Sequence, residues 1–203
     1  MAANNSLIII ISSPSGVGKT TIAKKILKKI KKSHLSISCT TRNPRKNECN
    51  KIDYFFISKQ KFIKYKKEKK FVETAKVHSN FYGTLKSELK KNNKNEVCLL
   101  DIDWQGARNI RKKIKNNCYS FFLLPPSISI LKKRLLKRHL DNKSLAISRL
   151  SSARKDLKHW DEYDFVYVND NLNSCVAKIC KKINDLVYEK NKRLHFKQMI
   201  KKL

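Results

Sequence analysis

The sequence predicts an α/β fold, in which helices flank a parallel sheet and a small lobe is inserted. The first observation behind this prediction is the apolar run at residues 7–11, Leu-Ile-Ile-Ile-Ile, which is typical of a strand buried on both faces. The second is that similar runs at residues 97–101, 119–124 and 165–168 alternate with stretches whose apolar residues recur at helical spacing. The third is that residues 38–84 hold short strand-like runs without long intervening helices, which indicates an inserted lobe.

The first predicted strand is followed by a glycine-containing loop and a helix over residues 18–32. The loop, residues 12–21, reads Ser-Ser-Pro-Ser-Gly-Val-Gly-Lys-Thr-Thr. Its glycines allow the backbone N–H groups to turn inward, and the helix N-terminus adds its positive dipole end. Strand, loop and helix in this order are the context that a phosphate-binding loop requires, with Lys19 on the β- and γ-phosphates and the Thr20 hydroxyl on Mg²⁺.

Ser13 stands where the full pattern G-x-x-x-x-G-K-[ST] has a glycine. The alternative is an ordinary strand-to-helix turn that contains Gly and Lys, but Gly-Val-Gly-Lys-Thr after an apolar strand favours the phosphate-binding loop. We therefore expect a P-loop NTPase-type sheet that binds a nucleoside triphosphate with Mg²⁺. The residues expected to bind it are Ser13, Pro14, Ser15, Gly16, Val17, Gly18, Lys19, Thr20 and Thr21.

The chain is strongly basic, with 47 Lys and Arg against 16 Asp and Glu and a net charge of +31. This charge has two interpretations, a nucleic-acid-binding surface or a compositional bias that places Lys on solvated faces. The lysines are spread through almost every segment, and no basic stripe interleaved with aromatic residues occurs. The pattern favours compositional bias, and we expect no specific nucleic-acid partner.

No apolar run approaches the roughly 18 to 20 residues of a membrane span. The apolar run at 7–11 is too short for a signal peptide and leads directly into the loop. We therefore expect a cytoplasmic protein without a membrane partner. The six cysteines contain no C-x-x-C pair, and several lie in strand- or helix-like runs, which favours buried free thiols over a zinc site or disulfides.

The 203 residues are long enough for one α/β domain with an inserted lobe. Its core is expected at about 1–37, 85–126 and 160–203, with an inserted lobe at about 38–84. The other expected strands cover residues 34–39, 53–57, 71–77 and 81–84. The other expected helices cover residues 58–67 (with Ser58 as N-cap), 85–92, 105–113, 127–138 and 144–159. A C-terminal helix with a frayed or solvated Lys-rich end follows them.

Asp101 ends a predicted parallel strand and should lie at the carboxyl edge of the sheet, where ligands bind. Only four glycines occur, so each is expected to serve a backbone conformation or a close approach that only glycine permits. Two lie in the loop. The others are Gly83 in Phe-Tyr-Gly-Thr and Gly106 in Asp-Ile-Asp-Trp-Gln-Gly, which begins at Asp101.

Together with Ser38-x-x-x-Arg42-x-x-Arg45 and Asp-Tyr-Phe-Phe at 53–56, these segments closely resemble guanylate kinase. The resemblance runs in order from residue 12 to about 170. It implies a core domain, a GMP-binding lobe at about 38–84 and a mobile helical lid at about 127–159. It also implies the reaction ATP + GMP = ADP + GDP, with Mg²⁺ accompanying ATP.

The resemblance implies that Arg42, Arg45, Tyr54 and Tyr82 hold the phosphate of GMP. The physical chemistry agrees, because paired guanidinium groups and phenolic hydroxyls suit a phosphate dianion. Two solvated loop arginines would be the simpler interpretation if the pair stood alone.

The resemblance also implies that Ser38, Glu73 and Thr84 read the guanine, although a single Glu is more often a surface carboxylate. Asp101 and Asp103 are implied to belong to the GMP-binding site, where they lie near the phosphates and Mg²⁺ or orient an arginine. The sequence leaves these two roles open, and Asp101 joins Thr20 as a candidate Mg²⁺ ligand.

Three arginines match the lid region of the family, where they neutralise charge on the transferring phosphoryl group. They also lie among lysines, so a solvated basic helix face is the competing interpretation. Arg134 and Arg138 are one helical turn apart on one face, which favours convergence on a phosphate. The expected catalytic residues are Lys19, Arg42, Arg134, Arg138 and Arg149, and Asn169 is the expected contact of the adenine.

Beyond Ser13, the chain departs from the family in lacking the usual glycines after Arg45 and near Arg138, which predicts a stiffer or differently hinged lid. Two other functions compete: a non-catalytic guanylate-kinase-like interaction module and a nucleic-acid-binding protein. Retention of Lys19 and Thr20 argues against the module. The sequence leaves the oligomeric state open and is compatible with a homo-oligomer.

Overall fold

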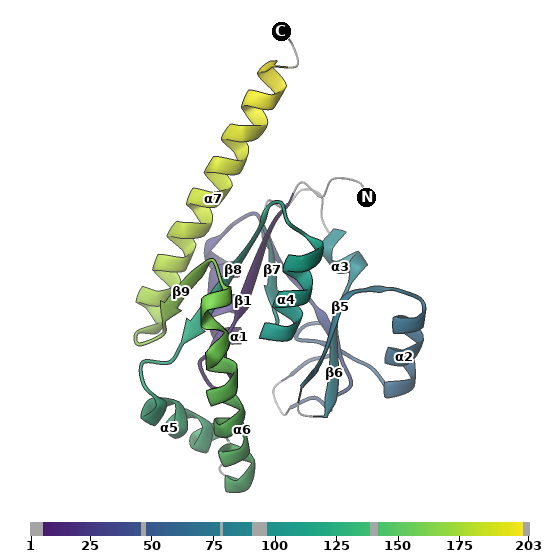
Figure 1. Cartoon of the computed structure of the whole chain (residues 1–203), viewed down its shortest axis with the longest axis vertical. Coiled ribbons are helices and arrows are strands. Elements are labelled where there is room, and N and C mark those ends of the chain that lie inside the picture. The colour runs from purple at the N-terminus through teal and green to yellow at the C-terminus, as the bar shows by residue number, and fades with distance from the viewer. Residues whose placement is uncertain (1–5, 46–47, 78, 91–96, 139–141, 201–203) are drawn as a thin grey trace.

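A computed structural model describes residues 6–45, 48–77, 79–90, 97–138 and 142–200. It shows a central sheet with helices on both faces and a second, smaller sheet beside it (Figure 1). The central strands are β1 (Leu7–Ser12), β2 (Ser33–Ser36), β7 (Val97–Asp101), β8 (Cys118–Leu124) and β9 (Phe165–Val168). The helices are α1 (Lys19–Lys29), α2 (Lys59–Lys67), α3 (Lys86–Lys90), α4 (Trp104–Lys113), α5 (Ile128–Arg138), α6 (Lys143–Asp156) and α7 (Leu172–Ile200).

Strand β1 is the centre of the core, since every one of its residues is buried. Its side chains alternate between two hydrophobic clusters. Leu7, Ile9 and Ile11 pack with residues of α1 and α7, whereas Ile8 and Ile10 pack with residues of α4. Burial on both faces is the reason that this strand is continuously apolar, and it confirms the α/β fold expected from the sequence.

The central sheet has the strand order β2-β7-β1-β8-β9, and its neighbouring strands pair in parallel. Because β1 lies between β7 and β8, the chain leaves β1 toward one side of the sheet and later continues on the other. Ligands of such sheets bind in the crevice at the carboxyl ends of the strands next to this point. Asp101, the last residue of β7, lies at that edge as predicted.

The second sheet has the order β4-β3-β6-β5, and its strands are β3 (Ser38–Thr40), β4 (Phe55–Phe56), β5 (Phe71–Val77) and β6 (Asn80–Leu85). Helix α2 packs on this sheet through Phe62, whose ring stacks on Phe71 and Phe81 at centroid distances of 4.6 and 5.4 Å. The Ser58 hydroxyl accepts a hydrogen bond from the Lys61 N–H (3.2 Å), so the expected N-cap of α2 is confirmed.

The prediction of one strand over residues 34–39 is wrong, because this segment is divided between two sheets. Ser33–Ser36 pairs with β7 in the central sheet, and Ser38–Thr40 pairs with β6 in the second. At the break, the Ile37 N–H donates to Glu88 Oε2 (3.1 Å) instead of to a neighbouring strand. Alternation of apolar and polar residues shows that a segment is extended, but it carries no information about its pairing partner.

Two further boundaries differ from expectation. The expected strand at 53–57 is reduced to β4, with an isolated bridge between Asn50 and Tyr54 before it. Helix α6 ends at Asp156 and continues as a 3₁₀-helix over Leu157–Glu162. The Trp104 indole Nε1 donates to Asp156 Oδ1 (3.1 Å), so the end of α6 is joined to the start of α4.

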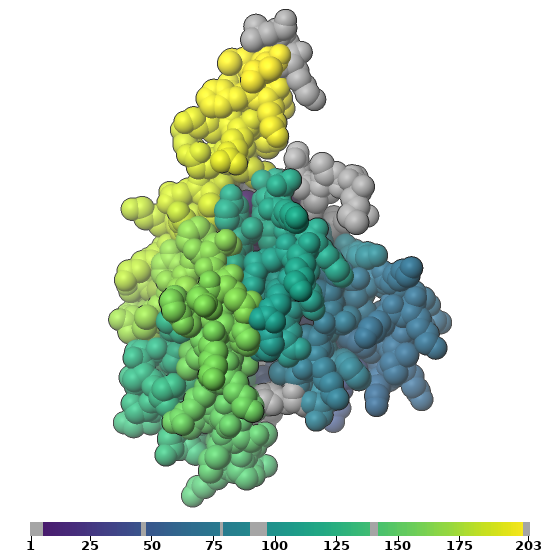
Figure 2. Space-filling view, viewed as in Figure 1, coloured from purple at the N-terminus to yellow at the C-terminus, as the bar shows by residue number. Residues whose placement is uncertain are grey.

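The C-terminal helix α7 is longer than expected. Its Lys-rich end remains helical to Ile200, and its outer half projects from the body of the molecule (Figure 2). Tyr188, Phe196, Met199 and Ile200 are exposed there. Among the described residues, no helix combines the length and apolar character needed to cross a membrane. The cysteines Cys39, Cys49, Cys98, Cys118, Cys175 and Cys180 are free thiols.

The loop after Arg45 shows the physical consequence of lacking glycines. Lys51 adopts a positive φ of 68°, a left-handed conformation that disfavours residues with a Cβ atom. Its N–H donates to the Tyr54 carbonyl (2.8 Å), so this turn sets the position of Tyr54.

Lys51→Gly is expected to raise the free energy of unfolding by about 0.5 to 1 kcal/mol, because relief of the left-handed strain exceeds the added entropy of the unfolded chain. This corresponds to a Tm increase of roughly 2 to 4 °C at most in thermal denaturation. Lys64→Gly, in the middle of α2, is the control and should lower the stability by about 1 kcal/mol. A Tm decrease in Lys51→Gly would contradict the inferred strain.

Candidate active site

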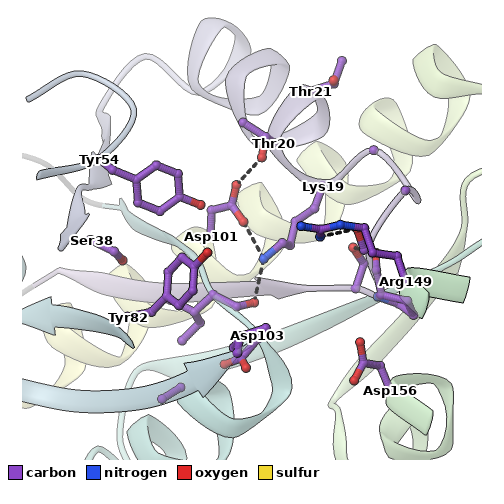
Figure 3. Close-up of a pocket in the computed structure, with 18 of the residues that line it drawn as sticks. Lys19, Thr20, Thr21, Ser38, Tyr54, Tyr82, Asp101, Asp103, Arg149 and Asp156 are labelled. Atoms are coloured by element: carbon purple, nitrogen blue, oxygen red, sulfur yellow. Dashed lines mark hydrogen bonds and ion pairs between the residues drawn. The ribbon is translucent and has the colours of Figure 1, made fainter. Parts of the chain in front are cut away.

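A cavity of about 440 Å³ opens at the carboxyl edge of the central sheet, between the loop after β1, the second sheet and helices α5 and α6 (Figure 3). Its volume is within the range of small-molecule sites. Most of the residues singled out from the sequence line it: Ser13, Pro14, Ser15, Gly16, Gly18, Lys19, Thr20, Thr21, Ser38, Arg45, Tyr54, Glu73, Tyr82, Asp101, Asp103, Arg138 and Arg149.

The glycines of the loop are required by its shape. Gly16 and Gly18 have positive φ values of 91° and 105°, and a Cβ atom on Gly16 would lie 2.9 Å from Leu135 Cδ2. Ser13, in contrast, does not adopt a positive φ, and its Oγ donates to the Pro14 carbonyl (3.0 Å). The backbone at this position therefore accepts a side chain, which explains why the departure from the full motif leaves the loop intact.

Lys19, Thr20 and Asp101 form a compact polar group at the start of α1 (Figure 3). The Lys19 ammonium pairs with Asp101 Oδ1 (2.7 Å) and donates to the Ile102 carbonyl (3.0 Å). The Thr20 hydroxyl donates to Asp101 Oδ2 (2.8 Å). A lysine, a hydroxyl and a carboxylate thus meet where the loop backbone turns inward, an arrangement suited to a phosphate and a divalent cation.

Several cationic side chains line the cavity close to one another. Burial and the nearby charge of Arg45 lower the pKa of both the Arg138 and the Arg149 guanidinium groups. Arg149 Nη1 also donates to Ser15 Oγ (3.4 Å), which connects α6 to the loop. Cations that repel one another in a partly buried cavity favour the binding of an anion between them.

Arg134, Asn169 and Val17 lie outside the lining of this cavity. Arg134 donates through Nη1 to the Val17 carbonyl and through Nη2 to the Asn169 carbonyl, both at 3.3 Å. Asn169 Nδ2 donates to the same Val17 oxygen (2.7 Å). Arg134 therefore braces the loop from α5, while Arg138 reaches the cavity.

The residues expected to read a base form a row across three neighbouring strands. Thr84 on β6 pairs with Ser38 on β3 and with Glu73 on β5, whose register against β6 shifts between Phe71 and Glu73. The Thr84 hydroxyl donates to Glu73 Oε1 (2.7 Å). Thr84 itself does not line the cavity but holds Glu73, which does.

Glu73 is buried, with only 4% of its surface exposed, and its Oε2 has no hydrogen-bond partner among the described residues. Burial raises the pKa of this carboxyl to about 7, with a smaller contribution from the Asp103 charge. A Cβ atom on Gly106 would lie 3.0 Å from Glu73 Oε2, so this glycine allows the carboxylate to approach α4. The site therefore presents one buried acceptor that a ligand N–H could satisfy.

Asp101 and Asp103, whose roles the sequence left open, occupy different positions. Asp101 contacts Lys19 and Thr20, as described above. Asp103 is the N-cap of α4, where its Oδ1 accepts from the Gly106 N–H (2.9 Å) on the side of Glu73. Burial raises the pKa of the Asp103 carboxyl.

Tyr54 and Tyr82 face each other in edge contact, with ring centroids 6.1 Å apart. Arg42 lies behind them and outside the lining of the cavity, and its Nε donates to the Tyr82 hydroxyl (3.3 Å). Burial is the main factor that raises the pKa of the Tyr54 phenol. Two phenols and Arg45 thus line the wall opposite the loop.

Sequence reasoning missed several residues of the site. Ala75, Val77, Ile102 and Asp156 also line the cavity, and Glu48 pairs with Arg42 beside it. Asp156 follows Arg149 by seven positions on one helix and therefore shares its face, a periodic signal present in the sequence. Ile102 acts through its backbone carbonyl, for which side-chain motifs carry no signal.

A divalent cation would have few protein ligands here. The described residues contain no group of three or more His, Cys, Asp or Glu side chains that could hold a metal. The Thr20 hydroxyl and the Asp101 carboxylate are adjacent, and such a pair suits Mg²⁺, which takes most of its remaining ligands from substrate phosphates and water.

The comparisons with known proteins agree with each other. A protein-family model described as Guanylate kinase matches residues 5–187 of this chain. Guanylate kinase of Rickettsia prowazekii (strain Madrid E) is 45% identical over 177 residues, which cover 87% of this chain and 89% of that protein. Guanylate kinase of Rickettsia felis (strain ATCC VR-1525 / URRWXCal2) is 46% identical over 178 residues, covering 87% and 92%. The crystal structure of guanylate kinase from Anaplasma phagocytophilum has a TM-score of 0.75 and 30% identity, covering 90% of this chain and 86% of that chain.

The buried Glu73 carboxyl should make the ligand-free protein less stable at high pH. Its pKa rises from 4.5 in the unfolded chain to about 7, so its stabilising contribution is complete below pH 4.5 and is lost as the pH rises through 7. Glu73→Gln should therefore be stabilised relative to the natural protein at pH 8 but not at pH 5. The difference is on the order of 3 kcal/mol at most, measured by denaturant unfolding.

Glu68→Gln is the matched control, because Glu68 is on the surface and pairs with Lys70 (2.7 Å). It should show no gain in stability at pH 8. A Glu73→Gln variant whose stability relative to the natural protein is the same at both pH values would contradict the raised pKa.

Proposed function

The chain belongs to the guanylate kinase family and phosphorylates GMP with ATP, and we propose that the cavity holds both nucleotides, ATP along the loop and GMP against the second sheet. The observation that carries this assignment is Glu73 Oε2, a buried carboxylate oxygen without a partner among the described residues. Guanine offers adjacent N–H donors at N1 and N2, which a carboxylate can accept together.

ATP is assigned to residues 13–21 and Asn169. The loop backbone surrounds the phosphates. Asp101 and the Ile102 carbonyl hold the Lys19 ammonium at a position from which it contacts the β- and γ-phosphates. Asn169 Oδ1 is buried and has no partner among the described residues. It is therefore an acceptor to which the amino group of adenine could donate.

Mg²⁺ is assigned to Thr20, with Asp101 beside it, on the basis of the adjacent hydroxyl and carboxylate. When bound, the ion neutralises phosphate charge and polarises the transferring phosphoryl group. Asp101 is also the counter-charge of Lys19, and this pair keeps the lysine in place for the phosphates.

The phosphate of GMP is assigned to Arg45, Tyr54 and Tyr82, with Arg42 behind them. The guanine is assigned to Glu73 and Ser38, with Thr84 holding Glu73 from the neighbouring strand in the row across β3, β6 and β5. Asp103, on the side of Glu73, belongs to this half of the site, whereas Asp101 belongs to the phosphate and Mg²⁺ half.

Phosphoryl transfer then requires positioning and charge neutralisation more than covalent chemistry. Arg138 and Arg149 come from α5 and α6 to the cavity, and Lys19 comes from the loop, so cations meet between the two nucleotides. The acceptor oxygen of GMP is already ionised at neutral pH, so the transfer needs no general base. Arg134 contributes by bracing the loop through Val17 and Asn169.

We assign the second sheet with α2 to the GMP-binding lobe (about 38–84) and α5, α6 and the first turn of the 3₁₀-helix to the lid (about 127–159). The missing lid glycine would lie at residues 139–141, outside the described residues, so the stiffer hinge stays a prediction. Cytoplasmic location, the absence of a specific nucleic-acid partner and a homo-oligomeric state also stay predictions.

A coupled assay for ADP release with GMP, AMP, CMP and UMP tests the assignment, and GMP should be phosphorylated by far the fastest. Lys19→Met should keep the fold and lower the transfer rate by several orders of magnitude, because Lys19 is the loop side chain at the phosphates. Lys28→Met, on the exposed face of α1, should behave like the natural protein. Near-normal turnover by Lys19→Met would refute the loop assignment.

Glu73→Gln should raise the KM for GMP sharply and leave the KM for ATP nearly unchanged, because only the guanine contacts this side chain. The natural protein should prefer GMP over AMP by roughly 10⁴-fold, since adenine has no proton at N1 to donate to the carboxylate, and this preference should be smaller in Glu73→Gln. In the natural protein the KM for GMP should also rise as the pH falls below about 7, where protonation of Glu73 removes an acceptor. IMP, which lacks the 2-amino group, should have a higher KM than GMP in the natural protein, and this difference in KM should be smaller in Glu73→Gln.

Steady-state kinetics with GMP, IMP and AMP from pH 6 to pH 8.5 measure these effects. Unchanged selectivity in Glu73→Gln would mean that another group reads the guanine.

A further inference from the structure

Arg42 is held by a carboxylate from its own loop. Its Nη1 and Nη2 donate to Glu48 Oε2 and Oε1 at 2.8 and 3.0 Å, a two-point contact. Its Nε donates on another edge to the Tyr82 hydroxyl (3.3 Å). The guanidinium carbon also lies 5.5 Å from the centre of the Tyr54 ring. These contacts fix the plane of Arg42, although Arg42 itself does not line the cavity.

The same carboxylate holds Arg45. Glu48 Oε2 accepts from the Arg45 backbone N–H (2.9 Å), and Oε1 accepts from Arg45 Nη1 (3.3 Å). Both oxygens of Glu48 therefore serve both arginines. The Arg42 and Glu48 side chains are 13% and 15% exposed, so their pair is largely removed from solvent, whereas Arg45 is 40% exposed. Such a two-point, partly buried ion pair is stronger than a surface pair.

The contact between Arg42 and Tyr82 has a consequence inside the cavity. Because the Tyr82 oxygen accepts from Arg42, its own O–H proton remains free to point elsewhere. Tyr82 lines the cavity, so this proton is available to an anion there. Glu48 thus acts on the cavity wall in two ways, through Arg45 directly and through Arg42 and Tyr82.

We propose that Glu48 is a positioning residue for the phosphate of GMP, which orients Arg45 and the Arg42–Tyr82 pair before the nucleotide binds. This inference rests on the proposed function of the cavity. Glu48 touches neither reacting atom in the assignment above, and its effect is confined to the half of the site that holds the GMP phosphate.

Electrostatics favour positioning over competition between Glu48 and the phosphate. Arg42, Arg45, Arg138 and Arg149 are close enough to repel one another, and the Glu48 charge opposes this repulsion at Arg138. Without it, the half-exposed Arg45 would turn toward solvent. The pKa of the Glu48 carboxyl is lowered by its contacts with Arg42 and Arg45 against the effect of burial, so Glu48 is charged at neutral pH.

The test compares GMP with guanosine, which differs only in lacking the phosphate. For Glu48→Gln, calorimetric titration should show a loss of GMP affinity of roughly 10- to 100-fold, because the neutral side chain no longer forms charge-assisted contacts. Affinity for guanosine should be unchanged. In steady-state assays the KM for GMP should rise by a similar factor, while kcat at saturating GMP and the KM for ATP stay within about twofold.

Two further variants make the result specific. Glu48→Asp keeps the charge but is one methylene shorter, so it should lose less GMP affinity than Glu48→Gln, and it carries the test if Glu48→Gln does not fold. Glu68→Gln removes an exposed carboxylate from an ion pair with Lys70 on the same lobe and should change no constant.

Three outcomes would overturn the proposal. Tighter GMP binding by Glu48→Gln would show that Glu48 competes with the phosphate. Equal losses for GMP and guanosine would show that it merely maintains the lobe. A natural protein that neither binds nor phosphorylates GMP would overturn the proposed function itself, and this arm is measured first, which separates the two failures.

Discussion

Mutual repulsion among the cations around the cavity is the constraint on which the rest of the site depends. Lys19 comes from the start of α1, Arg45 from the loop after β3, and Arg138 and Arg149 from α5 and α6. The protein holds these charges together with carboxylates placed at the two ends. Asp101 pairs with Lys19 at one end, and Glu48 pairs with Arg45 at the other. The centre of the cavity is left for the negative charge of the substrates.

The burial of the Glu73 carboxylate combines a cost in stability with the selectivity for the base that we propose. A buried carboxylate oxygen without a partner destabilises the ligand-free protein, and a carboxyl pKa near 7 is the direct sign of that cost. In the function we propose, the same oxygen distinguishes guanine from adenine, because the wrong base leaves it unpaired. Stability and selectivity are therefore opposed at one atom, and the partners of Glu73 on neighbouring strands keep it in place.

Polar contacts join the parts of the molecule that form the cavity, in addition to apolar packing such as that of Leu131 and Leu135 of α5 in the main core. Lys24 of α1 pairs with Asp53 in the loop before β4 (2.6 Å), and Arg149 of α6 donates to Ser15 of the loop after β1. Trp104 of α4 donates to Asp156 at the end of α6. Polar contacts of this kind can break and re-form at low cost, which suits the movement of the GMP-binding lobe and lid that we propose.

The amino-acid sequence by itself determined the central strand, the phosphate-binding loop and the helix after it. Continuous burial, glycines at left-handed positions and helical periodicity are properties of residues that are neighbours in the chain. The family resemblance, read from motifs such as that at residues 101–106, supplied most of the residues that the structure brings to the cavity.

Only the tertiary structure decided how distant segments pair. It divided residues 33–40 between two sheets, separated Asp101 from Asp103, and placed Glu48 on Arg42 while Arg134 turned to the loop backbone. Sheet pairing, helix rotation and the direction of a long side chain depend on contacts between residues far apart in sequence, whose energies no local pattern encodes.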